Sequence, residues 1–370
     1  MQVIELLNEL LRFKSITPND DGALNYIAMF MDEFETYNVE ENGVKNLILT
    51  KRFGDGVHLC FGGHIDVVPP GDGWDSDAFS PRISDGYIYA RGAQDMKSGL
   101  AAMLMAAKLS AQNTNFNGTL SLVITSDEEG EGLYGTKSAL NFMAKNGFLP
   151  QFGLIGEPTC DKIFGDCIKV GRRGSINGII TIKGKQGHAA YPQKCINPAH
   201  ELARVFGDFA AYNLDEGDQR FEPSKIVITD IRGGMGVCNV TPENVRIMFN
   251  VRNSPLSDEN DLKRHISKVF DGIDYDLDLK VSSKPFITDI NSKIVRALLD
   301  VVGRQCHEVP TLSTTGGTSD ARFFAEFGVA VAEFGVVNDT IHKVNERVSI
   351  EQVQKLAQIY YDLIERFNVE

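Results

Sequence analysis

The sequence predicts an α/β domain, with a mixed sheet flanked by helices, that is interrupted by an inserted ferredoxin-like α+β domain. In the first part of the chain, and again after about residue 289, short apolar strands alternate with helices. Between these parts the strands alternate apolar with polar residues, which is typical of a sheet that buries one face. We therefore expect a discontinuous first domain, residues 1–174 and 289–370, with the second domain inserted as residues 175–288.

Length and composition are those of a two-domain globular protein that does not bind nucleic acid. The chain has 370 residues, 42% of them hydrophobic and 24% charged, and its formal net charge is −13, whereas nucleic-acid binding needs a basic face. Its six cysteines are scattered without a CxxC pair, which indicates reduced thiols. Residues 1–13 predict an amphipathic helix rather than a signal peptide, and no apolar run approaches the ~18 residues of a membrane span. We expect a cytoplasmic protein.

The first part of the chain predicts helices and buried strands in alternation. Leucines at helical spacing predict a helix that ends at Thr17-Pro18, and a second helix is expected at 23–34. Residues 96–109 predict a helix that is apolar nearly all round, so it should be buried. The strands of this part are expected at 46–50, 57–61, 119–125 and 152–155.

Three of these strands are followed directly in the sequence by acidic residues and glycine. Open α/β sheets bind ligands at the carboxyl ends of their strands, so acidic residues that follow separate strands should meet at one edge of the sheet. A solvated charge run is the ordinary explanation of such residues, but its repetition after three buried strands favours a binding site. The acidic residues at these strand ends are Asp66, Glu128, Glu129 and Glu157.

His64 stands at the end of the strand that begins at Val57, two residues before Asp66. Side chains two apart in extended backbone point to the same side, so this imidazole and carboxylate should be adjacent, as in oriented metal ligands and catalytic bases. The alternative is a packed histidine at the edge of the core. Asp95 lies where a loop enters the helix at 96–109, and its alternative role is an N-cap.

These residues, together with His342 from a later loop, form a donor set that suits zinc or a similar ion. One ion needs about three protein ligands plus an open position, so a larger set suits two ions that share a carboxylate, ~3.5–4 Å apart. Glu128 and Glu129 are adjacent and cannot both point the same way from an extended backbone. One is therefore expected to bind metal, and the other to remain free as a general base beside a metal-bound water.

The segment after about Gly174 predicts the inserted domain, with the order β-α-β-β-α-β of a ferredoxin-like unit. One face of its sheet should pack on helices, and the other should face water or a partner. The expected strands are 176–183, 225–231, 244–253 and 274–281, and the helices are 197–212 and 258–270. The first domain then resumes with helices at 294–302, from 321 and from 349 to about 367, and a strand at 329–334.

Several short motifs carry a resemblance to a known family. They are GGHIDVVPPGDGW, RGAQDMK, SDEEGEG, GEPT, GRRGS, GHAAYP, TTGGTSDARF and EFGVVNDTIHKVNE. In this order they resemble the dinuclear-zinc amidohydrolase and exopeptidase family, which includes aminoacylases, acetylornithine deacetylase and succinyl-diaminopimelate desuccinylase. Each motif alone is weak, but the ordered set covers nearly the whole chain and is highly specific. It is closest to the desuccinylases, and it implies a zinc-exopeptidase-like fold for the first domain.

The resemblance implies a role for each residue of the predicted metal site. Asp95 would bridge two zinc ions, for which cobalt or manganese could substitute. Asp66 would hydrogen-bond the ring of His64 without touching metal, and Glu128 would be the catalytic base. The peptide bond after the bridging aspartate, Asp95-Met96, would be cis. The remaining ligands would be His64 and Glu157 for one ion, and Glu129 and His342 for the other.

The inserted domain resembles the family's dimerisation and lid domain, which implies a homodimer. His188 matches a histidine that the family supplies across the dimer to stabilise the oxyanion, whereas by itself it would be explained as a surface histidine at a hairpin end. Arginines grip carboxylates bidentately, so local recognition of an anionic substrate can overcome the net negative charge. The positions implied to grip substrate carboxylates are Tyr191, Asn239, Arg252, Gly317, Thr318 and Ser319, with Arg173 as a weaker candidate.

The resemblance implies hydrolysis of the N-succinyl amide of N-succinyl-LL-2,6-diaminopimelate to succinate and LL-2,6-diaminopimelate, a step of lysine and diaminopimelate biosynthesis. The nearest alternative is another deacylase, such as one acting on acetylornithine, because Ile65 and the order Lys97-Ser98-Gly99 depart from the desuccinylase pattern. A non-catalytic ligand-binding protein on the same fold is an alternative of a different class. Glu128 argues against it, because a binder has no use for a free carboxylate beside metal ligands. No nucleic-acid or membrane partner is expected.

Overall fold

The computed structural model describes residues 2–368, which form two compact units. The first unit comprises the described residues up to Val170, together with Ile287–Ser313 and the residues from Ser319 onward. The second comprises Gly171–Phe286 and Thr314–Thr318. The boundaries expected from the sequence lie at 174/175 and 288/289, and the short segment Thr314–Thr318, expected in the first domain, groups with the second unit.

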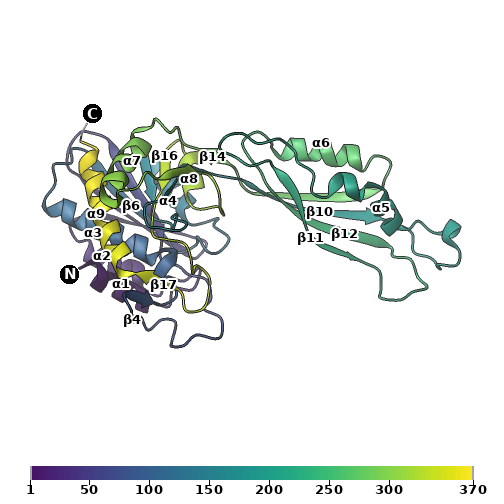
Figure 1. Ribbon diagram of the computed structural model, residues 1–370, viewed down its shortest axis with the longest axis horizontal. Helices are drawn as coiled ribbons and strands as arrows, with labels where there is room; N and C mark the ends of the chain where they lie inside the picture. The colour runs from purple at the N-terminus through teal and green to yellow at the C-terminus, as the bar shows by residue number, and fades with distance from the viewer. Residues whose placement is uncertain (1, 369–370) are drawn as a thin grey trace. The chain divides into compact units, whose positions relative to one another are not determined.

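The first unit is built on an eight-stranded mixed sheet, and the predicted fold class is confirmed (Figure 1). In spatial order the strands are β1 (Glu35–Glu41), β2 (Val44–Arg52), β6 (Thr119–Thr125), β3 (His58–His64), β7 (Phe152–Ile155), β16 (Ala330–Glu333), β8 (Cys167–Lys169) and β15 (Thr311–Ser313). β6, β3, β7 and β16 run parallel to one another, and most of their residues are buried on both sides. Their carboxyl ends therefore share one edge of the sheet.

The helices of this unit are α1 (Val3–Arg12), α2 (Ala23–Phe30), α3 (Ser98–Gln112), α4 (Thr136–Lys145), α7 (Lys293–Cys306), α8 (Ala321–Glu326) and α9 (Ile350–Arg366). As predicted, α3 is buried over most of its circumference, and it packs against α1 and α9. A second group, α4 and α8, packs on the sheet through β2 and β6 and through β7 and β16 respectively. The apolar residues of α1, α3, α7 and α9 form one continuous core with the strands.

Several elements of this unit have no counterpart in the sequence prediction, and β1 and α4 are the longest of them. β1 is an edge strand whose side chains are mostly exposed, and α4 buries only a narrow stripe that includes Ala139, Leu140 and Met143. Neither shows the periodicity on which a sequence assignment depends. The helix expected from Met96 begins instead at Ser98, because the preceding residues form a short π-helix, η1 (Ala93–Lys97). A small separate sheet contains β17 (Arg347–Ser349), β5 (Tyr87–Tyr89) and β4 (Arg82–Ser84).

The second unit contains the predicted ferredoxin-like antiparallel sheet, with strand order β11-β12-β10-β13. Its alternating apolar residues pack with two helices in a core of their own, and the other face of the sheet is partly exposed. Its strands are β10 (Ser175–Lys183), β11 (Lys225–Gly233), β12 (Asn244–Arg252) and β13 (Tyr275–Ser283), and its helices are α5 (Pro198–Phe209), α6 (Glu259–Val269) and the 3₁₀ turn η2 (Pro192–Lys194). Two-residue strands, β9 (Gly171–Arg172) and β14 (Phe286–Ile287), lie where the chain passes from one unit to the other.

Two further observations concern residues 2–368 as a whole. No helix within this range combines the length and apolar character that crossing a membrane requires. All six cysteines fall within the range, and each is a free thiol.

Candidate active site

The predicted acidic strand ends meet at one edge of the eight-stranded sheet. β3 and β6 are parallel neighbours that end level with each other, because His64 pairs with Thr125. β7 is the parallel neighbour on the other side of β3. The segments that follow these three strands carry Asp66, Glu128, Glu129 and Glu157.

Two further predicted ligands reach this edge from other segments. Asp95 lies in η1, directly before α3, and its peptide bond to Met96 is cis, as the resemblance implies. His342 lies in the loop between β16 and β17, in a left-handed backbone conformation with φ 57°, and its side chain is 48% exposed. Residues from distant parts of the sequence therefore complete the cluster that the strand ends begin.

His64 has the orientation of a metal ligand. Its side chain is 1% exposed, and its Nδ1 lies 2.9 Å from the carbonyl oxygen of Asp66. Because a carbonyl oxygen only accepts, this hydrogen bond fixes the proton on Nδ1. Nε2 then faces the carboxylate oxygens of Asp95 at 3.2 Å and Glu157 at 3.5 Å. This nitrogen is the one available to bind an ion.

Asp95 presents its two carboxylate oxygens to two different histidines. Its Oδ1 faces His64, while its Oδ2 lies 3.4 Å from Nε2 of His342. The same Nε2 lies 2.9 Å from Oε1 of Glu129. Two groups of ligand atoms, each within 4.8 Å, therefore share Asp95: one adds His64 and Glu157, and the other adds Glu129 and His342.

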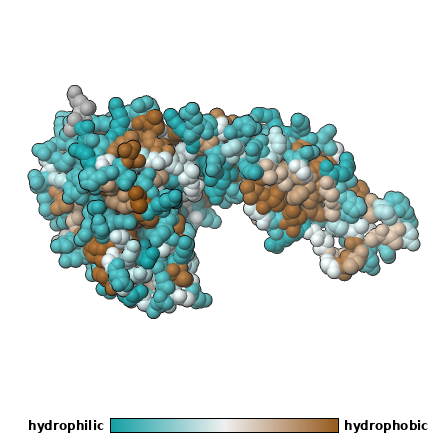
Figure 2. Space-filling model, in the orientation of Figure 1, coloured by the Kyte–Doolittle hydropathy of each residue, from teal (hydrophilic) through white to brown (hydrophobic). Residues whose placement is uncertain are grey.

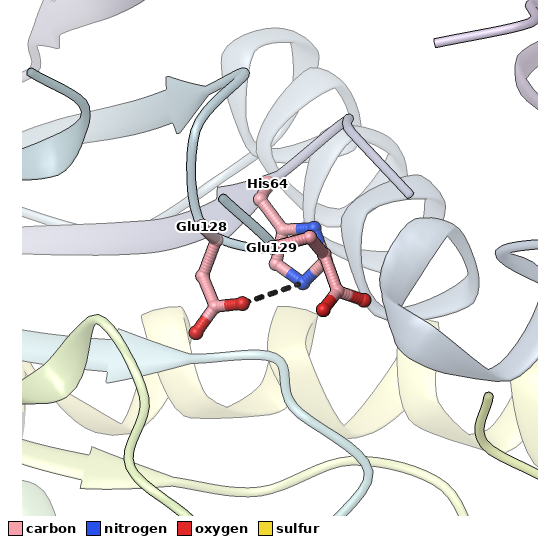
Figure 3. A group of neighbouring side chains, drawn as sticks. All are labelled: His64, Glu128 and Glu129. Atoms are coloured by element: carbon pink, nitrogen blue, oxygen red, sulfur yellow. Dashed lines mark ion pairs between the residues drawn. The ribbon is translucent and has the colours of Figure 1, made fainter. Parts of the chain in front are cut away.

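Glu128 and Glu129 both reach the cluster, because the extended backbone that the sequence prediction assumed for them is absent. The backbone after β6 forms a turn, so the two-residue alternation of a strand does not apply. Figure 3 shows both carboxylates beside the ring of His64, with Oε2 of Glu128 4.0 Å from Nε2. These three residues form a further group of ligand atoms within 4.8 Å. Proximity alone therefore does not distinguish which glutamate is a ligand and which a base.

Asp66 supports the ring of His64 and also the turn that follows β6. Its carboxylate is fully buried and lies 3.6 Å from Nδ1 of His64, while the closer contact to that ring comes from its carbonyl oxygen. The carboxylate also accepts the backbone N–H groups of Glu128, at 3.4 Å, and Glu129, at 3.0 Å. Asp66 therefore ties the end of β3 to the turn that carries both glutamates.

The carboxylates of the cluster have strongly shifted pKa values. Burial raises the pKa of Glu128 well above its usual value, and burial together with the charge of Asp95 raises the pKa of Glu157 to about 8. Burial also raises the pKa of Asp66 to about 6. Asp95 differs, because its hydrogen bonds with His342 and His64 outweigh burial and lower its pKa.

The imidazoles shift in the direction expected beside several carboxylates. Hydrogen bonds with Asp95 and Glu129 raise the pKa of His342 to about 10. Burial acts to lower the pKa of His64, but its hydrogen bonds with Asp95 and Glu157 outweigh burial and raise it well above the usual value. The cluster therefore has an excess of negative charge that holds protons on its histidines, and a divalent cation would neutralise the same charge.

The donor set is suited to a pair of divalent ions. Imidazole nitrogen and carboxylate oxygen are the ligands of catalytic zinc and of similar ions. Each of the two groups that share Asp95 offers three donors, the number that leaves a position open for substrate or water. The chemistry of these side chains thus agrees with the two-ion site that the sequence predicts.

Three residues predicted to contact substrate lie together in the second unit. The ring centroids of His188 and Tyr191 are 5.7 Å apart. The backbone beside His188 pairs with the backbone beside Asn239. These residues follow β10 and precede β12, at the end of the sheet where the last residue of β10 pairs with the first residue of β12. His188, Tyr191 and Asn239 are all largely exposed there.

The two predicted arginines lie at the opposite end of the same sheet. Arg173 and Arg252 line a hollow of about 540 Å³, and Arg173 forms an ion pair with Glu222 at 2.9 Å. Burial and the charge of Arg173 lower the pKa of Arg252, so two like charges share this hollow. β12 is nine residues long, so about 26 Å separates this end from the histidine end.

The remaining predicted substrate contacts lie in the segment before α8. Arg172 donates hydrogen bonds to the carbonyl oxygens of Gly317, at 3.1 Å, and Thr315, at 3.2 Å, which holds the turn that also contains Thr318. Ser319 is 2% exposed, and its hydroxyl donates to Oε1 of Glu333 at 2.8 Å. Ser319 therefore offers a ligand its backbone rather than its hydroxyl.

The sequence does not single out the residues that hold the two loops of the cluster together. Glu346 and Gln94 are buried and hydrogen-bonded beside Asp95 and His342. Neither belongs to a periodic pattern. The available signal is that both stand inside motifs that carry the family resemblance, Gln94 in RGAQDMK and Glu346 in EFGVVNDTIHKVNE.

Comparisons with known proteins agree with this geometry. A model of the Peptidase family M20/M25/M40 matches residues 60–366. The chain is 53% identical over 368 residues to a succinyl-diaminopimelate desuccinylase of Nautilia profundicola, covering 100% of both chains. It is 54% identical over 367 residues to a protein of the same name from a Nitratiruptor species, covering 99% of this chain and 100% of that one.

Solved structures share the fold at lower identity. Aminopeptidase PepT of Bacillus cereus superposes with a TM-score of 0.83 at 24% identity, covering 99% of this chain and 98% of that one. A dinuclear metal binding peptidase of the M20 family from Bacillus subtilis superposes with a TM-score of 0.76 at 15% identity, covering 99% and 97%. At such identities the likeness concerns the fold alone.

Proposed function

Because this chain belongs to the peptidase family M20/M25/M40, we propose that it is a metal-dependent amidohydrolase that converts N-succinyl-LL-2,6-diaminopimelate to succinate and LL-2,6-diaminopimelate. The family resemblance drawn from the sequence motifs is thereby confirmed. The observation that carries the substrate assignment is the identity of more than half of all residues, over the full length, to desuccinylases. The reaction belongs to lysine and diaminopimelate biosynthesis, and we propose a cytoplasmic location, in keeping with six free thiols.

The proposed cofactor is a pair of zinc ions, for which cobalt or manganese could substitute. Bound there, the ions would polarise the amide carbonyl and acidify a water molecule. Asp95 would bridge them, in keeping with its two oxygens facing two histidines. The outer ligands would be His64 and Glu157 on one side and Glu129 and His342 on the other.

Glu128 is proposed as the general base. Its carboxylate lies in the cluster, and burial raises its pKa, which brings it nearer to the range in which a group can both take and return a proton at neutral pH. It would take a proton from the attacking water as the oxygen adds to the amide carbon. When the carbon–nitrogen bond breaks, it would return the proton to the leaving amine. Asp66 would position this residue through the backbone N–H that it accepts.

The second unit is proposed to form a homodimer and to contribute to the partner's substrate site. His188 would stabilise the oxyanion, and Arg173 and Arg252 would bind a substrate carboxylate. In support, the histidine cluster and the arginine hollow lie at opposite ends of one sheet, about 26 Å apart, a separation longer than the substrate. One substrate molecule could therefore meet both only if they come from different chains. Tyr191, Asn239, Gly317, Thr318 and Ser319 remain further proposed contacts.

The test is turnover of two substrates by one metal-loaded preparation. Purified protein is reconstituted with zinc, its metal content is measured, and release of free amine is followed with N-succinyl-LL-2,6-diaminopimelate and with N-acetylornithine. We expect faster turnover of the succinylated substrate. Faster turnover of acetylornithine would overturn the substrate assignment, and metal binding without turnover of either would favour a ligand-binding protein.

A further inference from the structure

A buried carboxylate outside the ligand set holds the backbone of Asp95 and of the residues just before it. Glu346 is 1% exposed. Its Oε1 accepts the N–H of Gln94 at 2.7 Å and of Asp95 at 3.0 Å. Its Oε2 accepts the N–H of Gly92 at 2.9 Å and a hydrogen bond from Arg91 at 2.8 Å. Both oxygens are therefore engaged by the segment Arg91–Asp95, which leads into η1 and forms its first turn.

The side chain of Gln94 makes the reciprocal connection to the loop that carries His342. Its Nε2 donates to Oδ1 of Asp339 at 2.6 Å and to the carbonyl of Arg347 at 3.3 Å. Its Oε1 accepts the backbone N–H of Thr340 at 2.7 Å. Gln94 therefore contacts residues that precede His342 in the chain and one residue that follows it. Glu346 also lies in this stretch of the chain, directly before Arg347.

These contacts relate the two ligands that share one ion position. Asp95 and His342 face each other at 3.4 Å, but they are almost 250 positions apart in sequence, and the loop of His342 is the most exposed part of the cluster. The strand ends that carry His64 and Glu157 are held by the sheet. The His342 loop leaves the sheet after β16, and its hydrogen bonds to Gln94, in η1, tie it directly to the segment of Asp95.

We propose that Glu346 and Gln94 are positioning residues that hold the Asp95 and His342 segments in register and so set the affinity of the ion position formed by Asp95, Glu129 and His342. Neither residue touches the ion or the substrate. The inference rests on the two-ion site of the proposed function. The two ion positions then have different supports. The sheet holds the position that includes His64 and Glu157, and the side chains of Glu346 and Gln94 hold the position that includes His342.

The isosteric variant Glu346→Gln tests the inference without opening a cavity. A carboxamide offers one acceptor oxygen and one NH₂ group, so one of the two pairs of donors would face another donor. Removal of an outer hydrogen-bond partner of a metal ligand typically lowers metal affinity ~10–100-fold. We expect a loss of this size at the His342 position and a smaller loss at the His64 position, which shares Asp95 but keeps His64 and Glu157 on strand ends held by the sheet.

The measurement is titration of metal-free protein with Co²⁺, followed by calorimetry and by visible absorbance. His342→Ala identifies which of the two binding phases belongs to the His342 position. Glu365→Gln is the matched control, because Glu365 also holds a loop, through Thr114 and the backbone N–H of Asn115, before β6 begins. That loop lies at the other end of β6 from the site, about 20 Å away, so both binding phases should be unchanged in this control.

The outcomes separate the inference from the proposed function. Wild-type protein that binds fewer than two ions would contradict the two-ion site itself. Wild-type protein that binds two ions while Glu346→Gln keeps both affinities, or loses both equally, would overturn the inference alone. If Glu346→Gln does not fold, Gln94→Met removes only the side-chain contacts to the His342 loop, and it should weaken the same phase. Turnover at saturating Co²⁺ should recover in a variant whose defect is affinity.

Discussion

β3 carries a histidine at each end, and the two have opposite electrostatic surroundings. His58 begins the strand, and its Nε2 lies 2.7 Å from the hydroxyl of Ser121. Burial lowers its pKa to about 4. His64 ends the strand, where burial acts in the same direction, but hydrogen bonds with Asp95 and Glu157 raise its pKa well above the usual value.

The difference shows what distinguishes the histidine proposed as a metal ligand from a buried histidine without that role. Burial alone favours the neutral imidazole, which carries no charge and has one N–H donor instead of two. At the carboxyl end of β3, the segments after β6 and β7 add several carboxylates, and their charge reverses the effect of burial. The amino end of the same strand has no comparable cluster among the described residues. The site is therefore a property of one sheet edge, in agreement with the general behaviour of open α/β sheets.

The largest expected contrast is between alanine variants of these two histidines. His64→Ala removes a proposed ion ligand, so it should lower metal affinity by more than the ~100-fold typical of an outer partner and abolish turnover. His58→Ala should leave metal content and kcat close to those of the wild type. Metal analysis after gel filtration and the amine-release assay measure both. Equal metal loss in the two variants would contradict the assignment of the site to one end of β3.

Glu128→Ala should separate the base from the ligands within the same sheet edge. A general acid–base group contributes ~10²–10⁴-fold to the rate, so turnover should fall by that factor while two ions remain bound. Glu129→Ala is the matched comparison, because the neighbouring residue of the same turn should lose an ion as well as activity. Unchanged turnover in Glu128→Ala would remove this residue from the mechanism, and loss of an ion would make it a ligand.

The sequence predicted the sheet edge better than the details of its geometry. Buried strands that end in acidic residues are visible in the sequence, because strand burial and local charge are local properties. The turn after β6, which brings Glu128 and Glu129 together, was missed, because two adjacent glutamates do not reveal whether the backbone is extended or turned. The assignment of roles to Asp95 and His342 came only from the family resemblance.

The supports of the site were the least predictable part. Glu346 acts through backbone N–H groups that are just over 250 positions away, and no periodicity marks such a contact. In the fold, β1 and α4 were missed for a related reason, since each buries too few apolar residues to leave a pattern. The ferredoxin-like order of the second unit was predicted correctly, because its one-sided strands alternate clearly.

His188 extends the comparison to an exposed histidine in the second unit. If it stabilises the oxyanion, His188→Ala should lower kcat ~10²–10³-fold and leave both ions bound. Tyr191→Phe, which keeps the neighbouring ring, should have a smaller effect on turnover. Metal content and kcat measured on the same samples provide the test. Loss of zinc in His188→Ala would refute a role confined to the substrate.

The smallest effect concerns His58 and should appear in stability rather than in turnover. Its pKa is about 4 in the folded chain and about 6.5 when unfolded, so the unfolded state binds more protons between these values. The stabilising contribution is therefore fully present above pH 6.5 and is lost as the pH falls toward 4. Between pH 7.5 and 5.5, which stays above the isoelectric point, the loss should be about 1.4 kcal/mol. His58→Gln keeps a hydrogen-bonding group near Ser121 but does not titrate. The free energy of unfolding of both proteins is measured with urea at pH 7.5 and at pH 5.5. Between these two pH values the wild type should lose that amount of stability relative to the variant. If the free energy of unfolding changes with pH in the same way in the wild type and in His58→Gln, burial does not hold His58 neutral. The two histidines of β3 would then not differ in the way described.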